Sequence, residues 1–285
     1  MIAGLAYVIL SYHIKNLYSK SDFMNKLLIS IVSIIFLGAC TVSSTGRNQI
    51  TLFSASELNK MGKDSFEQMK QEIAINRDVK TNQYVQCVAN AITAQVPSSA
   101  HAGSWEVVVF ESDQVNAFAL PGGKIGVYTG ILKVANDQEQ LAAIIGHEVG
   151  HVLEQHSNER ISSNALSQTG LAIASSVLEV KNVANQSAIM AGLGVGLQYG
   201  VLMPYGRTHE TEADIVGQEL MARSGFNPEA SIRLWKNMAS QSKLSPPEFM
   251  STHPSSETRI NQLSKHLSVS TPLFKQSKTR IDCGI

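Results

Sequence analysis

The chain has 285 residues, of which 44% are apolar and 16% are charged, and its 23 basic side chains balance its 23 acidic ones. This is the composition of a globular protein with one large hydrophobic core or two small ones. A neutral chain with 6% aromatic residues has neither the basic surface nor the stacking side chains of nucleic-acid-binding proteins, so we expect no nucleic-acid partner.

The N-terminal residues resemble a bacterial export signal. Met24-Asn25-Lys26 is followed by an apolar stretch over 27–36 and by Leu37-Gly38-Ala39-Cys40. Small residues before a cysteine resemble a lipobox, so we expect Cys40 to carry palmitate or a similar lipid; the alternative is an uncleaved membrane anchor, for which the stretch is short. By resemblance to bacterial sorting rules, Thr41 favours an outer-membrane lipid anchor with the chain facing the periplasm.

A signal peptide begins at the initiator, but residues 1–23 precede Met24. We interpret them as a mis-assigned upstream extension, with a genuine longer precursor as the alternative. The predicted organisation is a signal peptide at 1–39, a lipidated polar tether at 40–53 and one folded domain at 54–285.

Apolar spacing predicts the first elements of the folded domain. One helix is expected over 54–75, with a capping box made by Ser54 and Glu57, and a second over 81–95. Runs of β-branched residues between turn residues then predict three short strands, at 105–110, 116–120 and 124–129.

The second half of the domain is predicted to be helical. A long helix begins at Asp137, and residues 158–203, which are rich in Ala, Ser and Gly, are expected to form buried helices. Further helices are expected over 207–223, from Asn227-Pro228 and after Pro254. The fold class is therefore α+β, mostly helical with a small sheet.

The sequence His147-Glu148-Val149-Gly150-His151 lies within the long helix. Histidines four residues apart lie on one helical face, where both can bind one zinc ion. Glu148 lies one position round the helix, close enough to take a proton from a water molecule at the metal. The alternative is a chance match with solvated histidines.

A catalytic zinc site needs a third protein ligand. His156 is the nearest candidate, but at about 100° per residue it lies roughly opposite His147, so we expect a surface histidine. Glu210 and Asp214 are four apart on a later helix, so one can bind the metal while the other accepts a hydrogen bond from a ligand histidine; Glu212 points elsewhere. Acids at a helix start also simply complement the helix dipole.

Together, HEVGH and RTHETEAD resemble the zinc metallopeptidase family of the CAAX prenyl protease and HtpX type, over about 45–265. The resemblance implies a gluzincin-type metallopeptidase domain with a small sheet beside the active-site helix, and one Zn²⁺ per chain. It implies Glu148 as the catalytic base. The residues implied at the metal and around it are His147, His151 and Glu210 as ligands, with Asp214 and Arg207 beside them.

Two weaker motifs belong to the same resemblance: Asn116-Ala117-Phe118 and Thr252-His253-Pro254. In the family, the Asn and the His lie near the scissile carbonyl, which implies that Asn116 and His253 stabilise the oxyanion. Without the resemblance, they are a turn residue and a pre-proline cap. Among family members, the chain is most similar to the periplasmic lipoprotein peptidases LoiP and BepA, without the tetratricopeptide repeats of BepA.

The expected function is zinc-dependent endopeptidase activity in quality control of the cell envelope. Unfolded or misassembled envelope proteins would bind as an extended strand along the sheet edge near 116–120, and the lipid anchor would hold the chain to the membrane. One alternative is a zinc-dependent chaperone or assembly factor with latent proteolysis, whose site the segment 190–206 covers. Another is a structural zinc module, which would have no use for Glu148.

The sequence has two cysteines in addition to Cys40, namely Cys87 and Cys283. An oxidising compartment would allow a bridge between them. The alternative is one buried thiol and one free thiol in the tail, since the sequence alone does not show that the two Cα atoms come within about 7 Å of each other.

Overall fold

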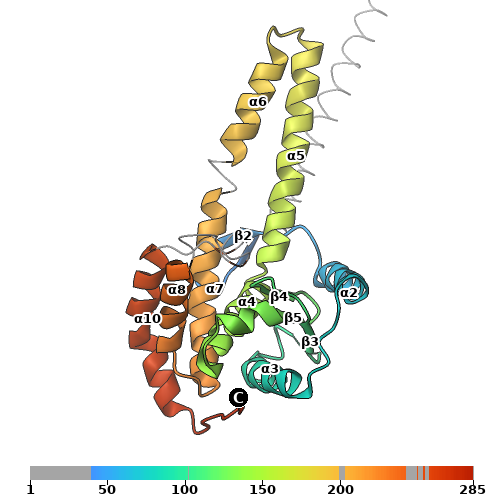
Figure 1. Ribbon diagram of the computed structural model, residues 1–285. Coiled ribbons are helices and arrows are strands. Elements are labelled where there is room, and N and C mark those ends of the chain that lie inside the picture. Colours follow the sequence, from blue (N-terminus) through green and yellow to red (C-terminus); the bar gives the residue numbers. More distant parts are fainter. Residues whose placement is uncertain are drawn as a thin grey trace, which may run out of the picture.

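The computed structural model describes residues 40–101, 103–198, 203–241, 249, 253 and 257–284. The predicted signal peptide at 1–39 lies outside these residues. Figure 1 shows a body of helices beside a small sheet, with a helical hairpin that projects from the body.

Three short strands form the sheet beside the central helix. They are β3 (Glu106–Phe110), β4 (Ala117–Leu120) and β5 (Lys124–Tyr128), which confirms the three predicted strands to within one residue at each end. The order is β3-β5-β4, with β3 parallel and β4 antiparallel to β5. β4 therefore lies at an edge of the sheet.

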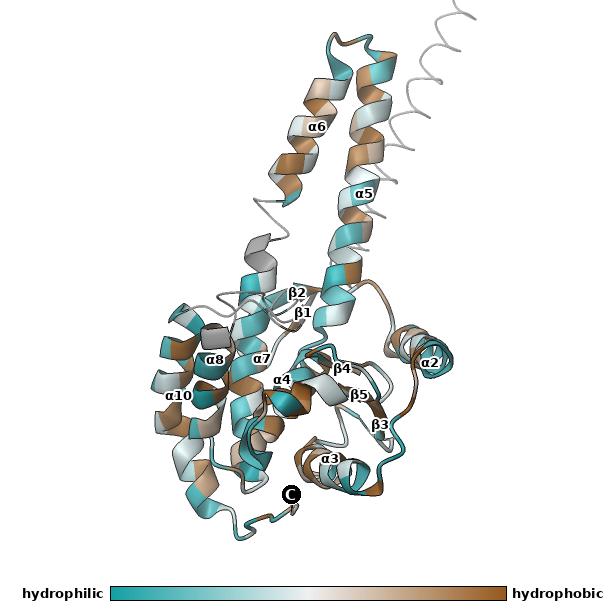
Figure 2. Cartoon of the chain, in the orientation of Figure 1, coloured by the Kyte–Doolittle hydropathy of each residue, from teal (hydrophilic) through white to brown (hydrophobic). Residues whose placement is uncertain are grey.

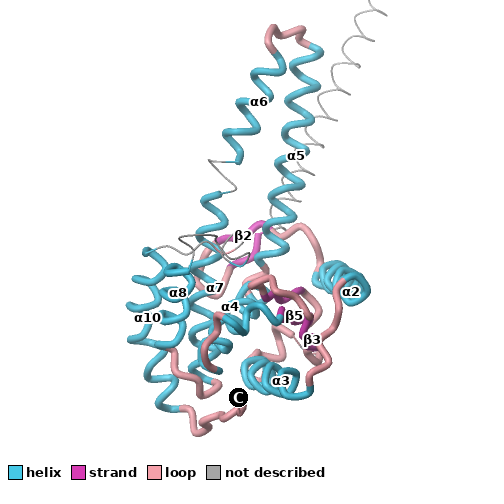
Figure 3. The backbone as a smooth tube through the Cα atoms, viewed as in Figure 1, coloured by secondary structure: helices cyan, strands magenta, loops and turns pink. Residues whose placement is uncertain are grey.

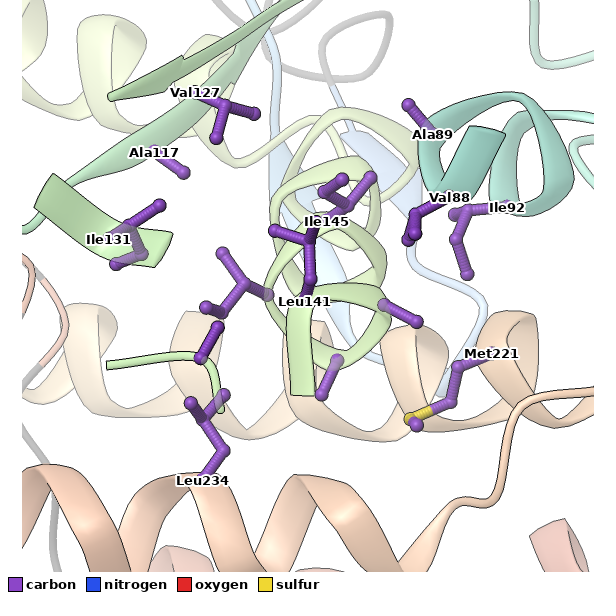
Figure 4. Close-up of a cluster of buried hydrophobic side chains, with 14 of the residues drawn as sticks. Val88, Ala89, Ile92, Ala117, Val127, Ile131, Leu141, Ile145, Met221 and Leu234 are labelled. Atoms are coloured by element: carbon purple, nitrogen blue, oxygen red, sulfur yellow. The ribbon is translucent and has the colours of Figure 1, made fainter. Parts of the chain in front are cut away.

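The helix α4 (Gln138–Leu153) runs through the middle of the core. Asp137 caps it, because its side chain accepts a 2.8 Å hydrogen bond from the Gln140 N–H. Figure 4 shows Leu141 and Ile145 of α4 among side chains from the surrounding elements. The labelled neighbours come from the helix α3 (Val79–Thr93), the sheet, the short 3-10 helix η1 (Thr129–Lys133) and later helices: Val88, Ala89, Ile92, Ala117, Val127, Ile131, Met221 and Leu234. Burying each large aliphatic side chain contributes about 1.5–3 kcal/mol.

The helix α2 (Ala55–Glu72) packs against the strands β4 and β5 of the sheet. Its capping box between Ser54 and Glu57 is present as predicted. Phe66 of α2 meets Phe110 of the sheet edge-on, with ring centroids 6.1 Å apart.

A second long helix, α7 (Met203–Arg223), lies against α4 with very close backbones. A Cβ atom on Gly217 would lie 2.6 Å from the backbone nitrogen of His147, and one on Gly146 would lie 2.8 Å from the Gly217 carbonyl oxygen. Only glycine fits at such a crossing. The acidic residues of α7 are thereby brought up to the histidines of α4.

The segment predicted to be a polar tether is instead a β-hairpin. β1 (Cys40–Val42) pairs antiparallel with β2 (Asn48–Ile50), and Gly46 in the turn has φ 87°. Ser43 and Gln49 in this hairpin are buried. Their side chains donate hydrogen bonds to the carboxylate of Glu212 and to the carbonyl oxygen of Glu154 in the body. Short-range composition had given no sign of these distant partners.

The projecting hairpin is formed by α5 (His156–Val180) and α6 (Gln186–Leu197). The prediction of buried helices over 158–203 is wrong for the described part of this segment, because α6 has no buried residue and α5 buries residues only near its base. Figure 2 shows apolar residues along both helices. Within the part of the chain that the structure describes, no helix has the length and apolarity needed to span a bilayer.

The helix α10 (Glu257–Gln276) packs against α7, and the helix α8 (Glu229–Gln241) packs against α4 and α10. The chain then returns to α3, where Cys283 forms a disulfide with Cys87 and the two Cα atoms are 5.6 Å apart. The backbone tube in Figure 3 shows this return past the start of α4.

Candidate metal centre

Four side chains converge where α4 and α7 cross. His147, His151, Glu210 and His253 each offer one ligand atom, and these atoms all lie within 4.8 Å of one another. The Nε2 atoms of His147 and His151 are 3.1 Å apart. Glu210 faces both rings at 3.4 Å, through Oε2 to His147 and through Oε1 to His151. The three predicted ligands are thus brought together.

The spacing of these atoms fits a divalent metal ion. Ligand atoms about 2.0–2.1 Å from one tetrahedral zinc ion lie roughly 3.4 Å from each other, which is close to the separations among His147, His151 and Glu210. In addition, Oε1 of Glu148 is buried beside them without a hydrogen-bond partner among the described residues. Buried carboxylate oxygens are normally hydrogen-bonded, so this atom is suited to face a bound ion or a water molecule on it.

Glu148 has the position of a proton acceptor. The residue is 4% exposed, and its Oε1 lies 3.4 Å from Nε2 of His253. Burial raises the pKa of Glu148, against the lowering effects of His253 and His147 and of a backbone hydrogen bond from Ala119. Because Ala119 belongs to β4, the edge strand of the sheet lies directly beside this carboxylate.

Two further side chains orient candidate ligands: Asp214 contacts His147, and Arg259 contacts Glu210. Asp214 Oδ1 lies 3.0 Å from Nδ1 of His147, which leaves the opposite ring nitrogen facing the cluster. Arg259 donates to Asp214 from Nε and Nη2, at 2.7 Å each, and to Glu210 from Nη1 at 2.8 Å. Burial opposes ionisation of Asp214, but Arg259 and His147 hold the pKa of Asp214 below its usual value.

The prediction that Arg207 belongs to this support is wrong. Arg207 is exposed on α7, and its carbonyl oxygen accepts a hydrogen bond from Thr211. Arg259 occupies the supporting position instead. Sequence analysis missed Arg259, because spacing along the chain could not place α10 against α7.

The prediction of a surface histidine at 156 is also wrong. His156 is 4% exposed, and its Nδ1 lies 2.8 Å from Nδ1 of His151. The helix is not continuous here, because Gln155 has φ 53° in the left-handed region between α4 and α5. This break moves His156 under His151, and burial lowers the pKa of His156 to about 4. Glu212 points away from the cluster as predicted. Its Oε2 lies 3.1 Å from Nε2 of His156.

The two predicted oxyanion residues have different surroundings. Asn116 lies at the start of β4, where its Oδ1 accepts from the Ala117 N–H at 3.0 Å. Among the described residues, no contact joins Asn116 to the four-residue cluster, so its role stays a prediction. His253 lies inside the cluster, with Nδ1 3.2 Å from Nε2 of His147 and 3.0 Å from Oε1 of Glu210.

A helix with an HExxH motif, faced by a glutamate from a second helix, defines a gluzincin-type metallopeptidase domain. The sequence profile described as Peptidase family M48 matches residues 79–267, and the chain belongs to this family.

Known relatives support the family and are longer than this chain. The mitochondrial metalloendopeptidase OMA1 of Schizosaccharomyces pombe is 34% identical over 165 residues, covering 57% of this chain and 47% of the relative. The beta-barrel assembly-enhancing protease of Yersinia pestis is 28% identical over 235 residues, covering 78% and 47%. Its Escherichia coli K12 counterpart is 25% identical over 247 residues, covering 84% and 50%. The chain spans about half the length of these curated relatives.

The OMA1 relatives contradict the predicted localisation. The OMA1 proteins, at 34% identity in two yeasts, are named as mitochondrial, and the expectation of an outer-membrane lipid anchor facing the periplasm is therefore wrong. That expectation depended on residues 24–41, which lie outside the region 79–267 that the family profile covers. The finer likeness to LoiP stays a prediction.

Proposed function

We propose that the chain is a zinc-dependent endopeptidase. The observation that carries this proposal is the buried Oε1 of Glu148, which accepts no hydrogen bond from a described residue and lies beside the converging cluster of His147, His151, Glu210 and His253. His147, His151 and Glu210 would hold the ion. When bound, zinc would polarise the scissile carbonyl and lower the pKa of an attacking water.

The side chains around the ion would then move and hold protons. Glu148 Oε1 would accept a proton from the attacking water and afterwards deliver it to the nitrogen of the leaving amine. Asp214 would hold the proton of His147 on Nδ1, so that Nε2 stays free for the metal. Asn116 and His253 are proposed to donate to the oxyanion once substrate is bound.

The edge strand β4 offers a binding mode for the substrate. An extended peptide would add to β4, since Ala119 of this strand touches Glu148 and would align the scissile bond with the base. Main-chain pairing tolerates many sequences, and this suits misfolded or misassembled envelope proteins as substrates. The relatives named beta-barrel assembly-enhancing protease support such a role.

Casein digestion with and without a chelator tests the proposal, beside the variant Glu148→Gln. The amide cannot take a proton, and the three ligands are unchanged. We therefore expect the variant to bind one equivalent of zinc and to lose activity by about 100-fold or more. Full turnover in the variant, or chelator-resistant digestion by the wild type, would contradict the assignment.

A second candidate function is that of a zinc-dependent chaperone or assembly factor with latent proteolysis. The observation that favours it is the position of His253, which makes a fourth donor where catalytic zinc sites keep an open position. His253→Ala separates the candidates in the same casein assay. Faster digestion by this variant, with wild-type suppression of substrate aggregation in Glu148→Gln, supports latency; slower digestion supports His253 as an oxyanion donor.

A further inference from the structure

A line of buried side chains leads away from the candidate ligand His151. Its Nε2 faces the cluster, 3.1 Å from Nε2 of His147, and its Nδ1 lies 2.8 Å from Nδ1 of His156. Beyond this ring, Nε2 of His156 lies 3.1 Å from Oε2 of Glu212. Both His156 and Glu212 are at most 4% exposed, so the ligand ring is held from behind by groups that water does not reach.

The chemistry of the ring nitrogens fixes where the protons lie. A neutral histidine that binds a metal through Nε2 carries its proton on Nδ1. His151 then donates to Nδ1 of His156, which must be the acceptor. His156 therefore carries its own proton on Nε2 and donates it to the carboxylate of Glu212. Each contact sets the tautomer of the ring before it.

Glu212 is in turn held by the N-terminal hairpin β1–β2. Ser43 Oγ donates to Oε1 of Glu212 at 2.7 Å, and Thr45 Oγ1 donates to the same oxygen. Arg47 donates to Oε2 from Nη2 at 2.7 Å, and its Nη1 lies 2.6 Å from Oε1 of Glu159 on α5. Figure 3 shows the hairpin where the bases of α5 and α7 meet the body. Three side chains of the hairpin thus hold the carboxylate that ends the line from the metal centre.

We propose that the β1–β2 hairpin is part of the metal centre. Through Glu212 and His156, it holds the ring of His151 in the tautomer and orientation that metal binding requires. His156 and Glu212 are positioning residues, because they act on the metal through His151. The inference rests on the proposed zinc site. It predicts that residues far in sequence from the metal ligands control the affinity of the chain for zinc.

Three variants separate this role from simple packing. His156→Phe keeps a ring but removes the acceptor for His151, whereas His156→Asn keeps an acceptor oxygen near the position of Nδ1. Thr45→Val changes only the hairpin end of the line. The matched control is Ser162→Ala on α5, which removes the acceptor of the 2.9 Å hydrogen bond from the Leu52 N–H without touching Glu212.

Three measurements are made on the full chain. Zinc affinity is measured by competition with a chromophoric chelator, the ligand field by the visible spectrum of the Co²⁺-substituted protein, and folding by the unfolding midpoint of the metal-free protein. We expect His156→Phe to weaken zinc binding by about 10- to 100-fold and to change the Co²⁺ spectrum. His156→Asn should recover most of this loss, Thr45→Val should show a smaller loss, and Ser162→Ala should move only the unfolding midpoint.

Wild-type zinc affinity in both His156→Phe and Thr45→Val, with a lowered unfolding midpoint, would overturn the inference and leave the proposed enzyme intact. Asn binding zinc no better than Phe at position 156 would also overturn it. A wild-type chain that binds no zinc would overturn the proposed function and this inference together. If His156→Phe does not fold, the comparison of His156→Asn and Thr45→Val with Ser162→Ala decides.

Discussion

At the scale of single residues, Arg259 shows how one side chain can hold a site together. It is 4% exposed, its guanidinium binds Asp214 through two nitrogens and Glu210 through the third, and it stacks on Trp235 at 3.9 Å. A planar fork of donors is needed for this, which a lysine ammonium group cannot supply. Two buried carboxylates on one helix thereby keep their charge and their orientation.

Replacing Arg259 with lysine is therefore expected to be damaging. Arg259→Lys should lower zinc affinity by about tenfold or more and the free energy of unfolding by about 2–3 kcal/mol, because hydrogen bonds to the carboxylates are lost. Chelator competition and urea unfolding measure the two effects. Arg207→Lys, on the exposed side of α7, is the control and should change neither; equal effects of the two changes would contradict this account.

The candidate site was predictable where it depended on the spacing within one helix. Four-residue spacing placed the HEVGH histidines together and set Glu210 on the same face as Asp214, as the structure shows. His156 was missed because its position depends on the helix break at Gln155, whose left-handed backbone no local sequence pattern announced. The hydrophobic periodicity of one helix also does not show which helix distant in sequence will pack against it.

At the scale of elements, the α4–α7 crossing fixes the distance between the ligands. Gly146 and Gly217 remove the Cβ atoms that would hold the two backbones apart. The crossing is therefore closer than aliphatic side chains would allow, and Glu210 reaches the histidines of α4.

A single methyl group at this crossing should disturb the site. Gly217→Ala would place a Cβ 2.6 Å from the His147 nitrogen, so the helices must separate, at a cost of about 1–3 kcal/mol in unfolding free energy. We also expect weaker zinc binding. Gly192→Ala on α6, where nothing lies within 4 Å, is the matched control and should stabilise its helix by about 0.5–1 kcal/mol. Unchanged zinc affinity in Gly217→Ala would contradict the role of the crossing.

The attachment of the hairpin to α5 should depend on pH. Burial opposes ionisation of Glu159, but Arg47 and His209 lower its pKa to about 2. A lowered folded-state pKa stabilises the protein above the unfolded-state pKa of about 4.3, and this contribution is lost as the pH falls toward 2. It amounts to at most about 3 kcal/mol at neutral pH.

Urea unfolding from pH 6 to 2.5 in excess EDTA checks this dependence. The gap in unfolding free energy between the wild type and Glu159→Gln should shrink as the pH falls below about 4.5. The exposed Glu179→Gln on α5 serves as the control, with little change at any pH. A gap that stays constant down to pH 2.5 would show that Glu159 ionisation does not hold the hairpin.

The sheet and most helices were predictable because their hydrophobic periods are local. The hairpin at 40–50 was not, since its polar residues pair with Glu212 and Glu159, more than a hundred residues away. The helices α5 and α6 were expected to be buried because they are apolar, but apolar composition does not show whether a helix faces a core or projects from it.

At the scale of the whole molecule, the C-terminal tail that follows α10 is fixed to the start of α4. Gln138 at the beginning of α4 donates to the Ile281 carbonyl at 2.7 Å, and its Oε1 accepts from the Cys283 N–H at 2.8 Å. The disulfide from Cys283 to Cys87 completes this attachment. The tail, α3 and α4 are thereby joined at one end of the body.

Removing this bridge should lower stability. Cys87 and Cys283 are 196 residues apart, and closing so long a loop stabilises the folded state by up to about 5 kcal/mol. In a Cys40→Ser background, Cys283→Ser should unfold at lower urea concentration than its oxidised parent. Reductant should lower the parent to the same midpoint and leave the variant unchanged; a parent that reductant does not affect would mean that the bridge adds no stability.

The bridge also changes what a break in the backbone would do. One cut between Cys87 and Cys283 leaves two pieces that remain covalently joined. The tip of the projecting hairpin, at 181–185, lies inside this interval, and exposed loop tips are preferred places for proteolytic nicking. A molecule nicked there, by itself or by another protease, would migrate as a full-length band without reductant and as two fragments with it. Backbone cuts accumulated over the life of the protein would thus escape detection until the disulfide is reduced.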